Sequence, residues 1–72
     1  MKALRCGDAA VLLEVDDLDA VLRLHAGLVA ADLPGVTDIV PAARTVLARF
    51  DPAVTSADAV VRVARSGGAV AP

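Results

Sequence analysis

The beginning of the chain alternates short apolar runs with a turn signal. Residues 2–6 alternate polar and apolar positions, and residues 9–15 form an apolar run rich in valine and leucine. Gly7-Asp8 lies between them and is a turn dipeptide, so the two runs are predicted to pair as a β-hairpin. Ala3 and Arg5 should share one side of the first strand.

A helical pattern of apolar residues, at steps of three and four, follows this hairpin. Asp16-Asp17 is expected to cap its first turn, and Pro34-Gly35 is expected to end it. The residues assigned to the apolar stripe are Leu18, Val21, Leu22, His25, Leu28, Val29 and Leu33. Because Leu22 then lies in the core, its replacement by alanine is expected to destabilise the fold by about 2–5 kcal/mol.

Two β-branched runs, Gly35 to Pro41 and Thr45 to Phe50, predict a second hairpin joined by residues 41–44. Strand alternation predicts which side chains share a face. In the first run Val36, Asp38 and Val40 should lie opposite Thr37 and Ile39, and in the second run Val46, Ala48 and Phe50 should lie opposite Leu47 and Arg49.

A second amphipathic helix is predicted after Asp51-Pro52, with Ala57, Val60, Val61 and Ala64 at helical spacing. Thr55 and Ser56 are both candidate caps at its start, and Thr55 with Asp58 fits a capping box. Gly67 is placed to end the helix. Residues 1–67 are expected to form one domain, and residues 68–72 a flexible tail or the stump of a linker.

The resulting order, β-β-α-β-β-α, predicts an α+β fold with two layers. The two helices should cover one face of a four-stranded, mainly antiparallel sheet. The other face is expected to carry alanine, valine and threonine side chains. This face is then either solvated or covered by something else, and its apolar composition is compatible with cover.

Composition narrows the classes of protein that this chain can represent. Hydrophobic residues make up 57% of 72 residues, and the formal net charge is −2. An acidic chain whose one aromatic residue is Phe50 is a poor candidate for nucleic-acid binding. The sequence contains neither a run of apolar residues long enough to span a membrane nor a signal-peptide pattern. Together with a single cysteine, Cys6, this predicts a cytoplasmic protein.

Candidate chemistry in the sequence is sparse, because no nucleotide-binding, metal-binding or nucleophile motif occurs. His25 is expected to be half-buried beside the apolar stripe, with one ring nitrogen hydrogen-bonded, and Cys6 to be a small buried hydrophobe. The candidates for partner binding are Arg5, Gly7, Asp8 and Arg44. Solvated charge is the simpler interpretation of the three charged residues, and a tight turn that of the glycine.

The segment from Pro34 to Pro52 resembles one protein family. Its pattern is Pro34-Gly35-Val36, then Val40-Pro41, then Arg44-Thr45 before an apolar strand, and finally Phe50-Asp51-Pro52. Together with Arg5, Gly7-Asp8 and the Glu14-bearing strand, it is similar to the N-terminal domain of allophanate hydrolase subunit 1 proteins. That family is also called the KipI or PxpB family. The resemblance extends over residues 4 to about 66 and implies the same β-β-α-β-β-α fold.

The resemblance implies a function in a larger assembly. Full-length members of the family act as one subunit of an ATP-dependent 5-oxoprolinase, which opens 5-oxoproline to glutamate. One member inhibits a sporulation histidine kinase through this N-terminal domain. The expected partners are therefore other 5-oxoprolinase subunits or a second copy of the chain, with a histidine kinase as the alternative. No cofactor is expected on this chain, although the family's full complex uses ATP.

The chain also departs from the family pattern. Relatives carry a second, cyclophilin-like domain, and this sequence ends about where that domain would begin, so hydrolysis by this chain alone is not expected. The usual tyrosine before the turn arginine is Ala43 here, and the usual phenylalanine after Glu14 is Val15. An assembly domain of a hydrolase subunit and a regulatory binding module both remain open as hypotheses.

Overall fold

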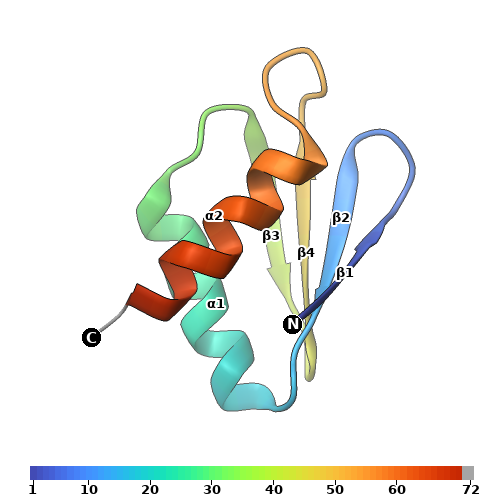
Figure 1. The fold of residues 1–72 in the computed structure, drawn as a ribbon. Coiled ribbons are helices and arrows are strands. Elements are labelled where there is room, and N and C mark those ends of the chain that lie inside the picture. The colour runs from blue at the N-terminus through green and yellow to red at the C-terminus, as the bar shows by residue number, and fades with distance from the viewer. Residues whose placement is uncertain (71–72) are drawn as a thin grey trace.

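Six elements follow one another in the computed structural model, which describes residues 1–70 and side chains as far as Ser66 (Figure 1). They are β1 (Lys2–Arg5), β2 (Ala10–Glu14), α1 (Leu18–Ala31), β3 (Val36–Pro41), β4 (Thr45–Phe50) and α2 (Ala57–Val70). The order is β-β-α-β-β-α, so the predicted α+β fold is confirmed. Neither helix among residues 1–70 has the length and apolar character needed to cross a bilayer.

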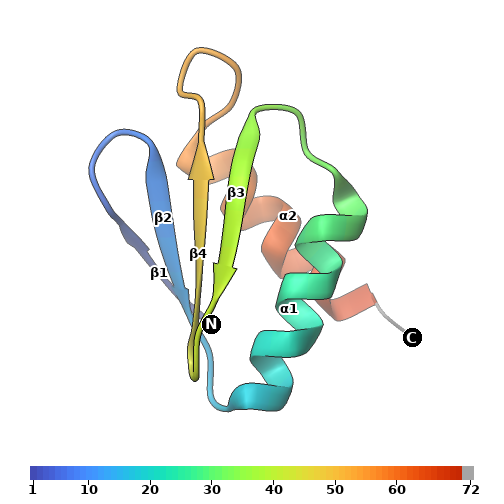
Figure 2. The same ribbon diagram turned by 180° about the vertical axis from the view of Figure 1, so that it is seen from behind.

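The four strands form one antiparallel sheet in the order β1-β2-β4-β3. Both predicted hairpins are present, and β2 and β4 pair with each other at the centre of the sheet. Figure 2 shows the sheet in front of α2, with α1 beside β3. The sheet therefore has one face covered by helices and one face that no described element covers.

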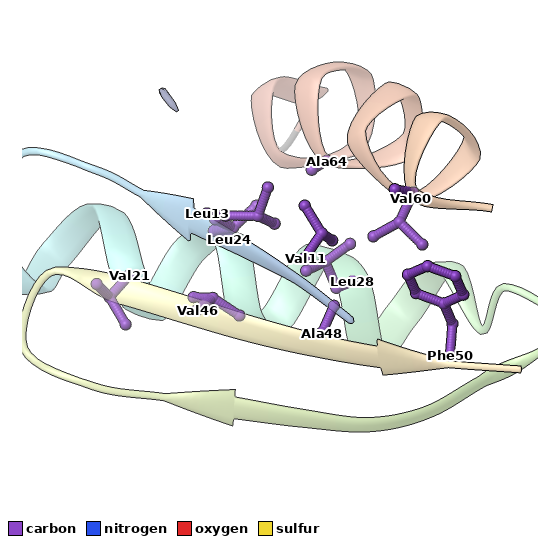
Figure 3. Packing of buried hydrophobic residues seen from close by; sticks show 11 residues of the cluster. Val11, Leu13, Val21, Leu24, Leu28, Val46, Ala48, Phe50, Val60 and Ala64 are labelled. Atoms are coloured by element: carbon purple, nitrogen blue, oxygen red, sulfur yellow. The ribbon is translucent and has the colours of Figure 1, made fainter. Parts of the chain in front are cut away.

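The core lies between the sheet and the two helices (Figure 3). Its eleven residues are Val11, Leu13, Val21, Leu24, Leu28, Val46, Ala48, Phe50, Ala57, Val60 and Ala64. All the buried side chains among the described residues are apolar. The predicted facing of Val46, Ala48 and Phe50 is confirmed, because all three are buried on the helix side of β4.

Helix α1 begins where the sequence predicts, but it presents a different face to the core. The Asp17 carboxylate accepts a hydrogen bond from the Ala20 backbone N–H at 2.8 Å, which caps the first turn. Leu24 is buried with 5% of its surface exposed, whereas Leu22 is 56% exposed. The prediction that Leu22 belongs to the core is therefore wrong. Apolar residues occupy a wide arc of α1, and the core contacts only one side of that arc.

Strand β3 contains an irregularity that the alternation pattern did not predict. Val36 pairs with Phe50 and Asp38 pairs with Arg49, so Thr37 is an extra residue, as in a β-bulge. Val36 consequently packs against the core on the helix side, whereas Asp38 lies on the opposite face. The expectation that these two residues share a face is wrong.

The end of β3 also differs from expectation. The sequence pattern places Pro41 in the connection between the strands, but the residue belongs to β3, where it pairs with Val46. Because β3 is an edge strand, a proline without an N–H group is tolerated there.

Helix α2 begins at one of its two predicted caps, lacks the predicted capping box and ends later than predicted. Ser56 caps it, because its hydroxyl oxygen accepts a hydrogen bond from the Ala59 backbone N–H at 3.2 Å. Asp58 forms an ion pair with Arg5 at 3.5 Å in place of the expected capping box with Thr55. The helix continues to Val70 and does not end at Gly67. Residues 71–72 of the expected tail lie outside the described residues.

Gly35 lies where the start of β3 comes close to the connection between β4 and α2. Its φ is +94°, and a Cβ atom built there would lie 2.9 Å from side-chain atoms of both Val54 and Thr55. The Gly35 carbonyl accepts a hydrogen bond from the Asp51 N–H at 2.7 Å. The backbone of Gly35, just before β3, therefore lies directly against the side chains of Val54 and Thr55. Any larger residue at this position would collide with these two side chains.

The two leucines of α1 provide a first test of the packing. We expect Leu24→Ala to lower the free energy of unfolding by about 2–5 kcal/mol, because it opens a cavity in the core. Leu22→Ala should cost less than about 0.5 kcal/mol, because the side chain is already exposed. Urea denaturation of both variants checks this, and equal losses would contradict the burial of Leu24.

The two glycines with positive φ provide a second test. An alanine in the left-handed conformation costs about 1–2 kcal/mol by itself. Gly35→Ala should destabilise the fold by more than this, because the new methyl group also collides with Val54 and Thr55. Gly7→Ala is the control, since Gly7 has φ +73° but open space around its Cβ position. Thermal unfolding of both variants measures the difference. A Gly7 variant as unstable as the Gly35 variant would exclude the steric explanation.

Candidate interaction surfaces

The uncovered face of the sheet carries one continuous row of aliphatic side chains. Paired residues on neighbouring strands share a face, and the register pairs Leu4 with Leu12, Leu12 with Leu47, and Leu47 with Val40. We call these four residues, one from each strand, the open-face row. Their neighbours along each central strand are buried on the helix side, so the row lies on the opposite side.

The ends of the open-face row are accessible to solvent. Leu4 is 39% exposed and Val40 is 44% exposed, whereas Leu12 and Leu47 at the centre are half-buried between neighbouring side chains. The expectation that this face carries alanine, valine and threonine is wrong in part, since three of the four residues are leucine. Larger side chains offer more apolar area to a partner than alanine would.

Charged residues border the open-face row on both sides. One neighbouring row pairs Lys2 with Glu14, and the other pairs Arg49 with Asp38. Ion pairs within the described residues are Arg5–Asp58 and Arg23–Asp19, so none involves these four side chains. An aliphatic centre with a charged border is the usual composition of a protein–protein interface.

Three of the four residues predicted to bind a partner lie together. Arg5, Gly7 and Asp8 line a hollow of about 180 Å³, between the β1–β2 turn and the start of α2. Thr55 and Ser56 line its other side. The Arg5 guanidinium is 3.5 Å from the Asp58 carboxylate, with both side chains largely exposed. The hollow offers polar groups for a contact, and its use by a partner stays a prediction.

Arg44 lies away from the other three predicted residues. It is in the β3–β4 turn, at the opposite end of the sheet from the β1–β2 turn (Figure 1). Its backbone carbonyl accepts a hydrogen bond from the Val15 N–H at 2.9 Å, but its side chain makes no hydrogen bond or ion pair within residues 1–70. A partner that contacts Arg44 would therefore meet a different part of the surface.

His25 and Cys6 are the side chains most often associated with catalysis or metal binding, and their surroundings differ in part from expectation. His25 is half-buried in α1, as predicted, but its ring has no hydrogen-bond partner within the described residues, contrary to expectation. Cys6 is exposed at the end of β1, so the prediction of a small buried hydrophobe is wrong. No group of three metal-ligating side chains occurs among residues 1–70.

Sequence reasoning missed the open-face row. Its four residues come from four strands, and no local pattern links Leu4 to Val40. The alternation within each strand predicted that Leu47 points away from Val46, but the register across the sheet aligned it with Leu12. Pairing the two apolar runs of residues 9–15 and 45–50 would have been the available signal.

A comparison with known protein families gives a match that covers nearly the whole chain. Residues 1–68 match the model described as carboxyltransferase domain, subdomain C and D. No match to a curated protein was found. The matched range includes every strand and most of α2, so the match concerns the complete fold described above.

The free side chain of Arg44 leads to a test of its role. Arg44→Ala should leave the melting temperature nearly unchanged, because the side chain makes no hydrogen bond or ion pair with the rest of residues 1–70. If it anchors a partner by charge-assisted hydrogen bonds, the same change should weaken association by about 1–3 kcal/mol. Calorimetry of the isolated chain and titration against a bound partner separate the two effects. A large fall in melting temperature would make Arg44 structural.

Proposed function

The chain belongs to the carboxyltransferase domain family, subdomain C and D, and from this premise we propose that it acts in the assembly of a multi-subunit enzyme. In this proposal it is the non-catalytic N-terminal domain of one subunit in an ATP-dependent 5-oxoprolinase. Its role is to hold subunits together while other parts of the complex bind ATP and open 5-oxoproline. The substrate and the ATP site belong to those other parts.

The open-face row is the observation that carries this proposal. A small chain gains stability by burying apolar surface, yet this one leaves four aligned aliphatic side chains on an uncovered face. Covering them with a partner would remove apolar area from water, at about 25 cal/mol per Å². Lys2, Glu14, Asp38 and Arg49 around the row would pair with charges on the partner and fix its orientation.

Residues 34–52 support the proposal that the chain is a KipI-type N-terminal domain. They carry the Pro-Gly-Val, Val-Pro and Phe-Asp-Pro pattern of the KipI family. Gly35 and Asp51 of this pattern hydrogen-bond to each other. This contact gives part of the pattern a role in packing, and the pattern itself favours membership of the KipI family.

The proposal is tested by disrupting the open-face row in the presence of candidate subunits. The double variant Leu4→Lys, Val40→Lys changes the two exposed ends of the row and leaves its half-buried centre intact. Co-expression with the other 5-oxoprolinase subunits, followed by size-exclusion chromatography, should show co-elution of the wild type and its loss in the variant. ATP-dependent 5-oxoproline turnover should fall in parallel, because desolvating two lysines opposes association.

Val54→Lys is the matched control, because Val54 is 58% exposed and lies in the loop before α2, away from the row. It should co-elute as the wild type does. Full turnover without the chain, together with the absence of co-elution, would exclude the assembly function. Inhibition of histidine-kinase autophosphorylation by the purified chain would instead favour the regulatory binding module.

A further inference from the structure

Helix α1 carries a second apolar stripe that faces solvent. Leu18, Leu22 and Val29 are 57%, 56% and 55% exposed, and His25 between them is half-buried. We call these four residues the outer seam. Their spacing is four, three and four residues, which is the repeat by which one helix packs along another. Over about 17 Å of helix, α1 therefore offers a surface shaped for a neighbouring helix.

The outer seam lies on the side of α1 that faces away from α2. Ala20 and Leu24, on the other side of α1, line a hollow together with Ala64 of α2. His25 and Val29 of the seam instead line a groove of about 320 Å³ between α1 and β3. Both views of the fold place α1 beside β3, at the edge of the sheet (Figures 1 and 2).

The floor of this α1–β3 groove is apolar and its rim is acidic. Leu28, Leu33 and Ile39 contribute aliphatic surface, and Asp32 and Asp38 contribute carboxylates. Neither carboxylate forms an ion pair within the described residues.

The same charge continues along the seam. Asp17 and Asp19 lie at the N-terminal end of α1, and the single arginine of the helix, Arg23, is 3.1 Å from Asp19. Arg23, the partner of Asp19, lines the hollow that α1 shares with α2, and Arg49 is paired with Asp38 in the strand register. Asp17 and the two carboxylates of the groove form no ion pair with the described residues, so the seam and the groove together remain acidic. A ligand for this surface must therefore combine aliphatic side chains with positive charge.

Strand β3 is closed to pairing with another strand. Its bulge at Thr37 interrupts the ladder, Pro41 has no N–H to donate, and the Asp38 carboxylate accepts the Ile39 N–H at 3.0 Å. A second copy of α1 is also disfavoured, because two surfaces of the same negative charge would face each other. The remaining occupant that fits the helical repeat is a helix of opposite charge.

We propose that the outer seam and the α1–β3 groove together bind a basic amphipathic helix of a partner protein. The partner helix lies along α1 and continues the layer that α1 and α2 form. Its aliphatic side chains pack between Leu22 and Val29 and into the groove, and its lysine or arginine side chains pair with Asp32 and Asp38. The surface contains none of the four residues of the open-face row and shares only Asp38 with its charged border, so this proposal does not depend on the assembly function.

A designed helix serves as the probe. A fluorescent peptide of about 18 residues, with leucine at the two seam positions of each heptad and lysine at the flanking positions, has the required chemistry. An otherwise identical peptide with glutamate in place of lysine tests whether positive charge is required. A peptide with the same composition in scrambled order tests whether the helical spacing of the leucines is required. Fluorescence anisotropy measures binding to the full chain, and amide chemical shifts locate the peptide.

The basic peptide should bind, and more weakly as salt rises from about 0.05 to 0.5 M. Amide shifts should change in α1 and β3 and remain constant in β1. Leu22→Ala should weaken binding by about tenfold. Val54→Ala removes an aliphatic side chain of similar exposure from the loop before α2, which lines neither the outer seam nor the groove, so it should have no effect.

The contribution of charge is tested by the double variant Asp32→Asn, Asp38→Asn. Asparagine tolerates the left-handed conformation of Asp32, whose φ is +47°, and can still accept the Ile39 N–H in place of Asp38. Affinity for the basic peptide should fall by about tenfold or more. The double variant Asp8→Asn, Glu14→Gln changes the net charge equally at distant positions and should retain the wild-type affinity.

Three results with the peptides would overturn the proposal. They are equal binding of the acidic or scrambled peptide, no binding of the basic peptide at about 1 mM, and shift changes confined to the open face of the sheet. Sedimentation showing a dimer that Leu22→Ala dissociates would also overturn it, because the occupant would then be a second copy.

Discussion

Burial of the inner side of β2 and β4 is the interaction on which the other features of the molecule depend. Leu13 and Val46 pair across these strands and are fully buried. A chain of 72 residues buries a smaller share of its surface than a large domain does, so its stability needs both helices on this one side. The opposite face of the sheet consequently has no cover from the described residues, and its aliphatic side chains remain available.

Helix α1 is apolar over a wide arc, and the two sides of this arc have different surroundings. Its inner side, with Leu24, packs against the core, and the stripe containing Leu22 lies beyond the edge of the sheet. The molecule thus has two separate apolar surfaces, the open-face row and the outer seam. The first has charges of both signs around it and the second is acidic, so they suit partners of different chemistry.

Two residues of the conspicuous sequence pattern at positions 34–52 have a role in packing. Gly35 allows the chain to turn with positive φ directly against Val54 and Thr55, and the Asp51 N–H donates to the Gly35 carbonyl. Pro52 follows at the start of the connection to α2. None of these residues belongs to the open-face row or the outer seam. Conspicuous residues in a sequence therefore need not lie on the surface with which a domain functions.

Local signals in the sequence determined the order of the elements, the Asp17 cap and the Gly7 turn, because each depends on residues close together in the chain. Strand alternation likewise determined that Val46 and Leu47 point to opposite faces. Only the tertiary structure decided that Leu24, and not Leu22, enters the core, since that depends on where α1 lies relative to the sheet. It also aligned the open-face row, because the register between strands is a contact between distant segments that no local pattern specifies.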